Sequence, residues 1–298
     1  MRKKLNHIRR DWVLYLILAP VILYFIIFRV WPIINMRLAF FDFKATTAWE
    51  WVGLKYFKMI FASPTFKAIL GNTLKLSFYK YVLVFPVYPL FAILLNELRL
   101  RYFRIYAQVV SYLPHFLSWV AITGIWISFL SPSSGGINQI LGWFGAAPVD
   151  FMTSKSHIYG VLVLSSIWRS LGWDSIIYFT AILGIPANLY DAAAIDGANR
   201  LQIIRNIIMP ALVTPMVTLF IINLGYFLSA GFDQVFNFTN DSVAMSIDIL
   251  DTYIYRLGIQ GGQYSLATAV GLLKGIVGVF LVLGTHFTSK KLTGKGVW

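Results

Sequence analysis

The sequence contains no cysteine, so disulfide bonds and thiol chemistry are excluded. Its four histidines, His7, His115, His157 and His286, are scattered without the spacing of a metal site. Charged residues make up only 12% of the 298 residues, about half of their share in a soluble globular protein, whereas 58% are hydrophobic. This composition predicts an all-α, polytopic membrane protein that holds no metal.

Acidic residues are scarce relative to basic ones, at 12 against 25, and the formal net charge is +13. A nucleic-acid-binding protein would gather its basic residues into a stripe on a polar face. Many of these residues instead stand at the ends of apolar runs, as membrane topology requires. Membrane lipid is therefore the expected partner of the basic residues, and nucleic acid is not.

Two further signatures are missing. The chain has no G-x-x-x-x-G-K-[ST] segment, so we expect that it does not itself hydrolyse ATP. It also lacks the paired Gly- or Pro-broken segments that mark the two halves of an inverted-repeat carrier. If the chain transports a solute, the energy must come from a separate ATPase.

The apolar runs predict six transmembrane helices. The basic N-terminus precedes an uncharged run that is too long and too aromatic for a signal peptide, and no small-residue cleavage site follows it. Pro86 and Pro89 are expected to kink the second span, and Pro215 the fifth. Segment 131–156 is expected to contain a short helix over 137–144, and segment 233–263 to be acidic and turn-rich. The predicted spans cover residues 12–28, 67–98, 105–130, 157–184, 210–232 and 264–289.

The distribution of Lys and Arg predicts that both termini are cytoplasmic. With that orientation, the inner segments hold 13 basic residues and the outer segments 7. The domain organisation that follows has three parts: residues 1–66 with the N-terminal tail, the first span and an outer segment; residues 67–289 as a five-span core; and residues 290–298 as a cytoplasmic tail.

The stretch 186–210 between the fourth and fifth spans is the most informative part of the core. Pro186 ends the preceding helix, the Ala-rich segment 189–196 favours a short helix, and Gly197 provides its stop. A second short helix is predicted over 200–208, and Pro210 is expected to open the next span. The predicted helix–turn–helix has a small Ala surface flanked by acids, which suits insertion into a groove on another protein.

This loop resembles the EAA loop of ABC-importer permeases, in which Glu-Ala-Ala-x-x-Asp-Gly-Ala is followed by a spacer, an apolar residue and Pro. Here the pattern stands as Asp191-Ala192-Ala193-Ala194-Ile195-Asp196-Gly197-Ala198 and ends at Ile208-Met209-Pro210. Asp191 replaces the usual Glu, which keeps the charge and shortens its reach. The resemblance implies that this loop couples the chain to an ATPase through Tyr190, Asp191, Ala192, Ala193, Asp196, Gly197 and Ala198.

The resemblance extends over roughly residues 10 to 298 and points to the sugar-importing group, in the branch for poly- and oligosaccharides. It rests on the segments 168–173 (WRSLGW), 231–237 (GFDQVFN), 251–256 (DTYIYR) and 267–272 (ATAVGL). It implies a type I importer fold with a MetI-like core in the bacterial cytoplasmic membrane. The implied partners are a second permease in a heterodimer, two ATPase subunits and an external solute-binding protein. ATP and Mg²⁺ would be held by the ATPases, and this non-catalytic chain would bind no cofactor.

A different class of protein is the alternative. A membrane enzyme would need a paired acid, a Ser/His/Asp set or a metal cluster, but the histidines are isolated and the acids concentrate in loops. A secondary carrier that works alone would leave the 186–210 loop without a role. The importer hypothesis accounts both for the missing P-loop and for this loop.

Charged residues inside the spans raise the question of substrate. A charge within the bilayer costs about 2.5–3.5 kcal/mol even on the lenient insertion scale, so each needs a reason. Arg29 is expected to anchor at the interface, and the side chains of Lys75 and Lys80 to extend toward the membrane surface. Arg169 shares its span with Asp174 but lies five residues from it, so stacking on Trp173, four residues on, is the equal alternative to that pair. If the basic residues instead line a water-filled path, an acidic oligosaccharide such as a uronate chain fits; the rival is a neutral oligosaccharide. The residues proposed for the substrate path are Arg169, Trp173, Asn223, Tyr226, Phe227 and Lys274.

Overall fold

The structure is a computed structural model that describes residues 12–44, 46 and 48–293. The basic N-terminal tail and Lys295, which contributed to the topology prediction, lie outside these residues. The described chain divides into two compact units. One unit runs up to Ser63 and includes Ile254–Leu273; the other holds Pro64–Tyr253 and the chain from Lys274 onward.

The first unit begins with a helix that is apolar on all sides and has no buried residue in its first 14 positions. Such a helix suits lipid on every face. It does not end at Phe28 as predicted, because regular helix resumes after Arg29 and the helical run continues to Phe40. The elements of this unit before Ser63 are α2 (Trp12–Phe25), η1 (Ile26–Val30), α3 (Trp31–Asn35), η2 (Met36–Phe40), β1 (Phe41–Asp42), β2 (Glu50–Trp51) and α4 (Lys55–Ala62).

A small antiparallel hairpin follows the first helical run, with Phe41 opposite Trp51. The hydroxyl of Tyr56 on α4 donates a hydrogen bond of 2.7 Å to Oδ1 of Asp42. This bond favours the ionised carboxylate and holds the pKa of Asp42 below its usual range. The segment predicted to be a polar outer loop thus has a defined structure.

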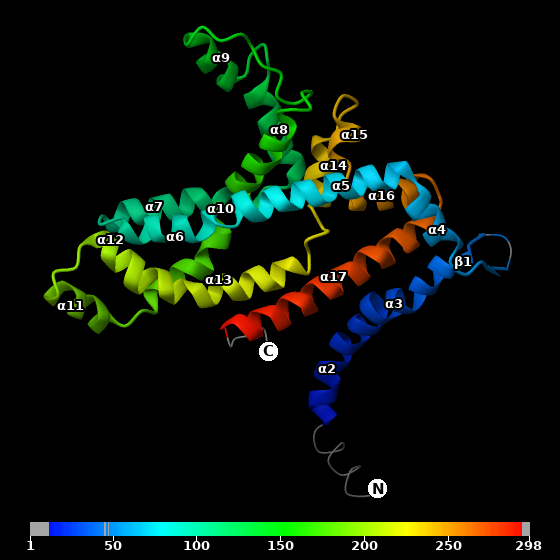
Figure 1. Ribbon diagram of the computed structural model, residues 1–298, viewed down its shortest axis with the longest axis horizontal. Coiled ribbons are helices and arrows are strands. Elements are labelled where there is room, and N and C mark those ends of the chain that lie inside the picture. Colours follow the sequence, from blue (N-terminus) through cyan, green and yellow to red (C-terminus); the bar gives the residue numbers. More distant parts are fainter. Residues whose placement is uncertain (1–11, 45, 47, 294–298) are drawn as a thin grey trace, which may run out of the picture. The chain divides into compact units, whose positions relative to one another are not determined.

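The second unit contains the helices from α5 to α15, which Figure 1 labels, and the candidate site lies in this unit. Within it, α10 packs against α6, α7 and α13. Its elements are α5 (Pro64–Tyr79), η3 (Lys80–Val84), α6 (Val87–Glu97), α7 (Arg101–Tyr112), η4 (Leu113–Phe116), α8 (Trp119–Leu130), α9 (Gly136–Trp143), α10 (Ile158–Leu183), α11 (Ala187–Ile195), α12 (Arg200–Ile203), η5 (Ile204–Ile208), α13 (Met209–Leu224), α14 (Phe232–Phe238) and α15 (Ala244–Ile247). The helices α16 (Leu250–Tyr255), η6 (Arg256–Gln260) and α17 (Tyr264–Thr293) complete the chain.

The predicted number of spans agrees with the described helices. Four helical runs are long and apolar enough to cross a membrane, and two bent pairs bring the number to six. The short helix predicted over 137–144 is present as α9, Gly136–Trp143. In the second span, regular α-helix gives way at Lys80 to a π-helical stretch and then to a turn before α6, near the kink expected from Pro86.

The third predicted span is wrong as a single helix. The chain bends by 108° between Phe116 and Trp119. Pro114 lies in a 3₁₀ turn, and the extended Ser118 starts a new helix, with its Oγ accepting a hydrogen bond from the backbone N–H of Ala121. The residues over 105–130 therefore form two helices that meet at a sharp bend.

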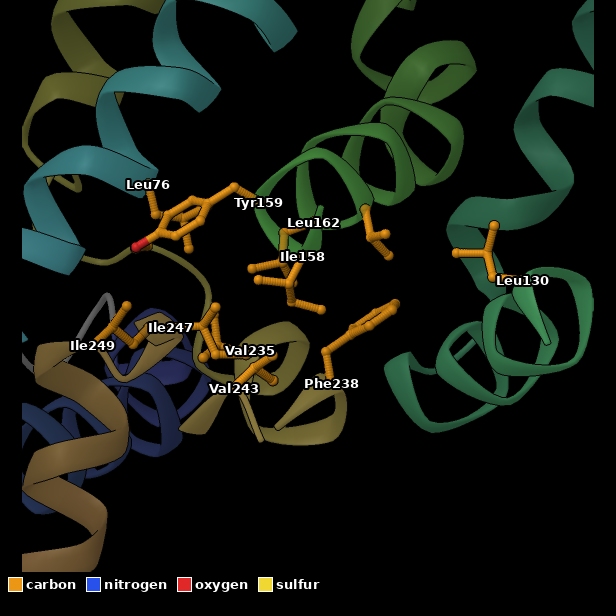
Figure 2. Packing of buried hydrophobic residues seen from close by; sticks show 12 residues of the cluster. Leu76, Leu130, Ile158, Tyr159, Leu162, Val235, Phe238, Val243, Ile247 and Ile249 are labelled. Atoms are coloured by element: carbon orange, nitrogen blue, oxygen red, sulfur yellow. The ribbon is translucent and has the colours of Figure 1, made fainter. Parts of the chain in front are cut away.

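The segment 233–263 is also different from the prediction, because it folds into short helices instead of turns. Figure 2 shows Ile158 and Leu162 of α10 facing Val235 and Phe238 of α14. Together with Val243, Ile247 and Ile249, these residues are part of a buried hydrophobic cluster. Each such side chain contributes about 1.5–3 kcal/mol when it is fully removed from water. The apolar residues between the acids, and not the acids themselves, decide how this segment folds.

Candidate transport cavity and coupling loop

The loop between α10 and α13 contains a short helix, α11, that ends in a hydrogen-bonded cap. The N–H of Ala198 donates to the carbonyl of Ala193 at 2.9 Å, and that of Gly197 donates to Ala194 at 3.2 Å. This pair of bonds is a Schellman motif, which needs a left-handed residue at its centre. Gly197 supplies it with φ +69°. The stop predicted at Gly197 is therefore confirmed.

The next helix begins with a second reciprocal cap. Asn199 Oδ1 accepts from the N–H of Gln202 at 3.0 Å, and the N–H of Asn199 donates to Gln202 Oε1 at 2.7 Å. From Arg200 the chain stays helical through η5 to Leu224, a run of 25 residues. The prediction that the span begins at Pro210 is wrong, because the helical run begins earlier, at Arg200. Pro210 is the second residue of α13 and directly follows the π-helical stretch η5.

The surface of the loop is unusually apolar for a segment that the structure leaves uncovered. Ile195 is 87% exposed and Leu201 is 73% exposed, while Asp191, Ala192 and Asp196 are exposed beside them. Tyr190, in contrast, packs against a buried cluster formed by α6, α10 and the helix from Arg200. One side of α11 is thus attached to the core, and the other is free to contact a partner.

An ion pair fastens the start of α12 to the end of α6. Nε of Arg200 contacts Oε2 of Glu97, and the Glu97 side chain is about three-quarters covered. The pair links the loop to the helix that continues the second span. An exposed pair contributes only about 0–1 kcal/mol to stability, so we expect its main effect to be on the position of the loop.

A cavity of about 320 Å³ lies within the second unit, between the second span, α10 and the end of α13. Its size is at the lower end of the range for small-molecule sites. The polar and aromatic groups that line it are Lys80, Tyr81, Phe85, Tyr88, Trp119, Ser166, Ser170, Asp174, Tyr178, Asn223, Tyr226 and Ser229.

The Lys80 ammonium does not extend toward the membrane surface as predicted. It donates to the carbonyl of Ala230 and to Oε1 of Gln234, both at 2.6 Å. Gln234 is fully buried and in turn donates to the Leu162 carbonyl at 2.6 Å and to Ser165 Oγ at 2.8 Å. The sequence segment 231–237 therefore contains the residue that fixes a lysine in the wall of the cavity.

Gly231 makes this arrangement possible. Its φ of +101° is strained for any residue with a side chain, and a Cβ there would lie 2.9 Å from Nζ of Lys80. The turn that brings the Ala230 carbonyl to Lys80 therefore depends on a glycine.

Replacing Gly231 with alanine is expected to lower the thermal unfolding midpoint, at a cost of about 1–3 kcal/mol from the backbone strain alone. The midpoint of the detergent-solubilised protein measures this effect. Gly124 is the matched control, because it lies in α8 and a Cβ at that position would have no atom within 4 Å. Its alanine variant should unfold at the wild-type midpoint or slightly above it; an unchanged midpoint in the Gly231 variant would contradict the strain argument.

Asp174 stands elsewhere in the cavity wall, with Tyr88 and Ser170 as side-chain hydrogen-bonding neighbours. The charged groups that act on it are His115 and Arg169. Arg169 does not stack on Trp173. Its guanidinium lies 5.0 Å from the centre of the Trp119 ring and donates to the His115 carbonyl at 3.3 Å.

The residues proposed for the substrate path are partly gathered at this cavity. Asn223 and Tyr226 line it, and Phe227 packs at 5.1 Å against the Tyr81 ring, which lines it as well. Only Asn223 is in α13; Tyr226 and Phe227 lie in the turn after it, so their placement on the fifth span is corrected. Trp173 stacks on His115 with ring centres 4.4 Å apart.

For two lysines, the predicted substrate path and the observed cavity wall disagree. Lys274 is not part of the cavity wall, because its ammonium pairs with Oδ1 of Asp251. Lys80 was left out of the predicted path although it lines the cavity. Its position in an apolar span was a reason to add it to the predicted path. Its hydrogen-bond partners could not be predicted, because they lie about 150 positions away in sequence.

The chain combines several membrane spans with a polar cavity and with a short exposed helix between two of the spans. These features are those of a multi-pass membrane protein that takes part in transport. The model of the family described as "Binding-protein-dependent transport system inner membrane component" matches residues 89–289. The chain belongs to this family, and it is a non-catalytic permease subunit of an ABC importer, as the resemblance of the loop implies.

Two similar proteins come from Bacillus subtilis, and one of them is named for polysaccharide transport. The polygalacturonan/rhamnogalacturonan transport system permease protein YteP of Bacillus subtilis is 38% identical, over 96% of this chain and 90% of YteP. Protein LplB of the same organism is 36% identical, over 98% and 92% of the two chains. These relatives and the family match confirm the expected membership in the sugar-importing group.

A solved structure is similar over almost the whole chain. A chain in the crystal structure of a bacterial ABC transporter involved in the import of the acidic polysaccharide alginate is 37% identical, with a TM-score of 0.91. The match covers 98% of this chain and 99% of that chain. A second crystal structure of a bacterial alginate ABC transporter, in complex with an alginate pentasaccharide-bound periplasmic protein, matches with a TM-score of 0.90. The type I importer fold predicted from the loop is confirmed.

Proposed function

We propose that this chain imports an acidic oligosaccharide as one permease of a heterodimer, with both of its termini in the cytoplasm. The observation that carries the substrate class is the 37% identity, over 98% of the chain, to a protein of an alginate importer. YteP is named for polygalacturonan, which is also a uronate polymer. Lys80 in the cavity wall is compatible with such a substrate.

The energy for transport is proposed to come from two separate ATPase subunits that hold ATP and Mg²⁺, while this chain binds no cofactor. The exposed surface of the loop supports this assignment, because Ile195 at the end of α11 and Leu201 in α12 offer apolar contacts next to the acids Asp191 and Asp196. Closure of the ATPases would shift this loop and favour one of two orientations of the core. An external solute-binding protein would deliver the oligosaccharide.

Purification of the tagged chain from its native membrane in mild detergent tests the assembly. Mass spectrometry is expected to find a second permease and an ATPase with it, in a ratio of about 1:1:2 for this chain, the second permease and the ATPase. Isolation of the chain alone, with detergent loss excluded, would favour a solitary carrier.

Uptake by the reconstituted importer with its binding protein tests the substrate. An oligogalacturonate is expected to enter proteoliposomes at least about ten times faster than its carboxyl-reduced, neutral counterpart, because the cavity wall presents a cation. Equal uptake of the two would contradict the acidic substrate and favour a neutral oligosaccharide.

A further inference from the structure

Lys80 has different partners from Lys274 and Arg200, the two cations of the second unit that form ion pairs. The ammonium of Lys274 is paired with the carboxylate of Asp251, and Arg200 is paired with Glu97. Lys80, in contrast, contacts only neutral acceptors, the Ala230 carbonyl and the Gln234 amide, among the residues that the structure describes. A charge held in a membrane protein without a counter-charge marks a functional position.

The geometry leaves part of the ammonium available. An ammonium has three N–H donors, and two of them are used by the acceptors at 2.6 Å. Lys80 is also one of the residues that line the cavity. Because both acceptors are held in place, by the turn at Gly231 and by the buried network of Gln234, the ammonium cannot follow a ligand far. It is a fixed cation.

Asp174 lines the same cavity, but its carboxylate forms no ion pair or hydrogen bond with the Lys80 ammonium within the described part of the chain. Asp174 lies in α10, whereas Lys80 lies in the second span. A ligand that reaches Lys80 meets a positive potential there, with the hydroxyl of Ser229 and the amide of Asn223 in the same wall.

We propose that Lys80 is the specificity-determining residue of the permease, and that its remaining N–H binds a uronate carboxylate while Ser229 and Asn223 bind sugar hydroxyls. The inference rests on the proposed function and names the group that would distinguish acidic from neutral sugars. A charge-assisted bond to a fixed ammonium is among the strongest contacts that a carboxylate can make. Because the ammonium is already ordered, little is lost in arranging it for the ligand.

Saturation-transfer NMR on the whole importer in lipid nanodiscs tests this inference without the binding protein. The probes are a trigalacturonate and its carboxyl-reduced counterpart. The wild-type complex is expected to bind the acidic sugar about ten-fold more tightly or better. K80Q should bind the two sugars within about two-fold of each other, and K80R should keep the preference. K75Q is the matched control, since Lys75 is an exposed residue of the same span that lies 4.4 Å over the Tyr159 ring; it should behave as wild type.

A preference that persists in K80Q overturns the inference, and so does a wild-type complex without preference. If K80Q does not assemble, S229D places a carboxylate in the same cavity wall as Lys80 and should also remove the preference; its retention counts against the inference. Uptake of the acidic sugar by the wild-type importer is the independent measure of the proposed function. Normal uptake together with no preference in nanodiscs rejects the role of Lys80 alone, whereas absent uptake rejects the function.

Discussion

Replacing Gly197 with valine is expected to reduce import at least about ten-fold while the chain remains folded and in the membrane. Gly197 has φ +69°, a conformation that costs a β-branched residue about 1–3 kcal/mol. No atom lies within 4 Å of a Cβ at this position, so the strain is confined to the backbone of the turn. The turn relieves it by leaving the left-handed region, which breaks the Schellman cap and redirects α11. The measurement is uptake by proteoliposomes alongside the ATPase rate of the same complex.

A matched control separates coupling from strain. Gly145 also has a positive φ, +77°, with no atom within 4 Å of a Cβ, and it follows α9 in another loop of the second unit. Its valine variant carries the same backbone cost without disturbing α11, and it should import at nearly the wild-type rate. Normal uptake in the Gly197 variant would contradict the coupling role. An equal loss in both variants would show that destabilisation, and not coupling, explains the effect.

Replacing Gly172 with alanine is expected to have the largest effect on stability. A Cβ there would lie 2.4 Å from the carbonyl oxygen of Ser111 on α7, a backbone atom that cannot turn aside as a side chain can. Relief requires α7 and α10 to separate, and overpacking of this kind costs about 3 kcal/mol. The thermal unfolding midpoint of the purified complex should fall by several degrees, and the yield from the membrane should fall with it.

Gly160 provides the comparison, because it lies in the same helix with no atom within 4 Å of a Cβ. Its alanine variant should keep the wild-type midpoint. If both variants unfold at the same temperature as the wild type, close contact of α7 with α10 does not hold the cavity wall in place.

The spans were predictable to the extent that local sequence determines them. Apolar length identified α10 and α17, and the Pro and Gly residues around α11 marked its ends, since these residues act on their own backbone. The bend after Phe116 could have been suspected from Ser118 ahead of an apolar run, which is an N-cap pattern. The short helices from Phe232 onward could not be predicted, because Val235 and Phe238 are buried by contacts with α10, about 75 positions earlier.

The candidate site likewise has a part that local sequence determines and a part that distant contacts determine. The loop could be located from its own residues, whereas the cavity is formed by side chains from the second span, α10 and the end of α13. Hydropathy showed that Lys80 lies in a span but not what it contacts. Of its two acceptors, Ala230 precedes the turn at Gly231 and Gln234 lies in α14, whereas the sequence predicted a membrane span up to residue 232 and a loop after it.

The unbroken helix from Arg200 to Leu224 has a mechanical consequence. At 1.5 Å per residue, its 25 residues form a rod of about 37 Å. One end carries Arg200 beside the exposed loop, and the other carries Asn223 in the cavity wall. The run contains the π-helical stretch η5 and Pro215, but the chain stays helical between its two ends, so a shift of one end is expected to displace the other. If a sugar binds Asn223 as proposed, the coupling is reciprocal: the bound sugar changes the equilibrium of the loop by the same free energy by which the loop changes the binding of the sugar.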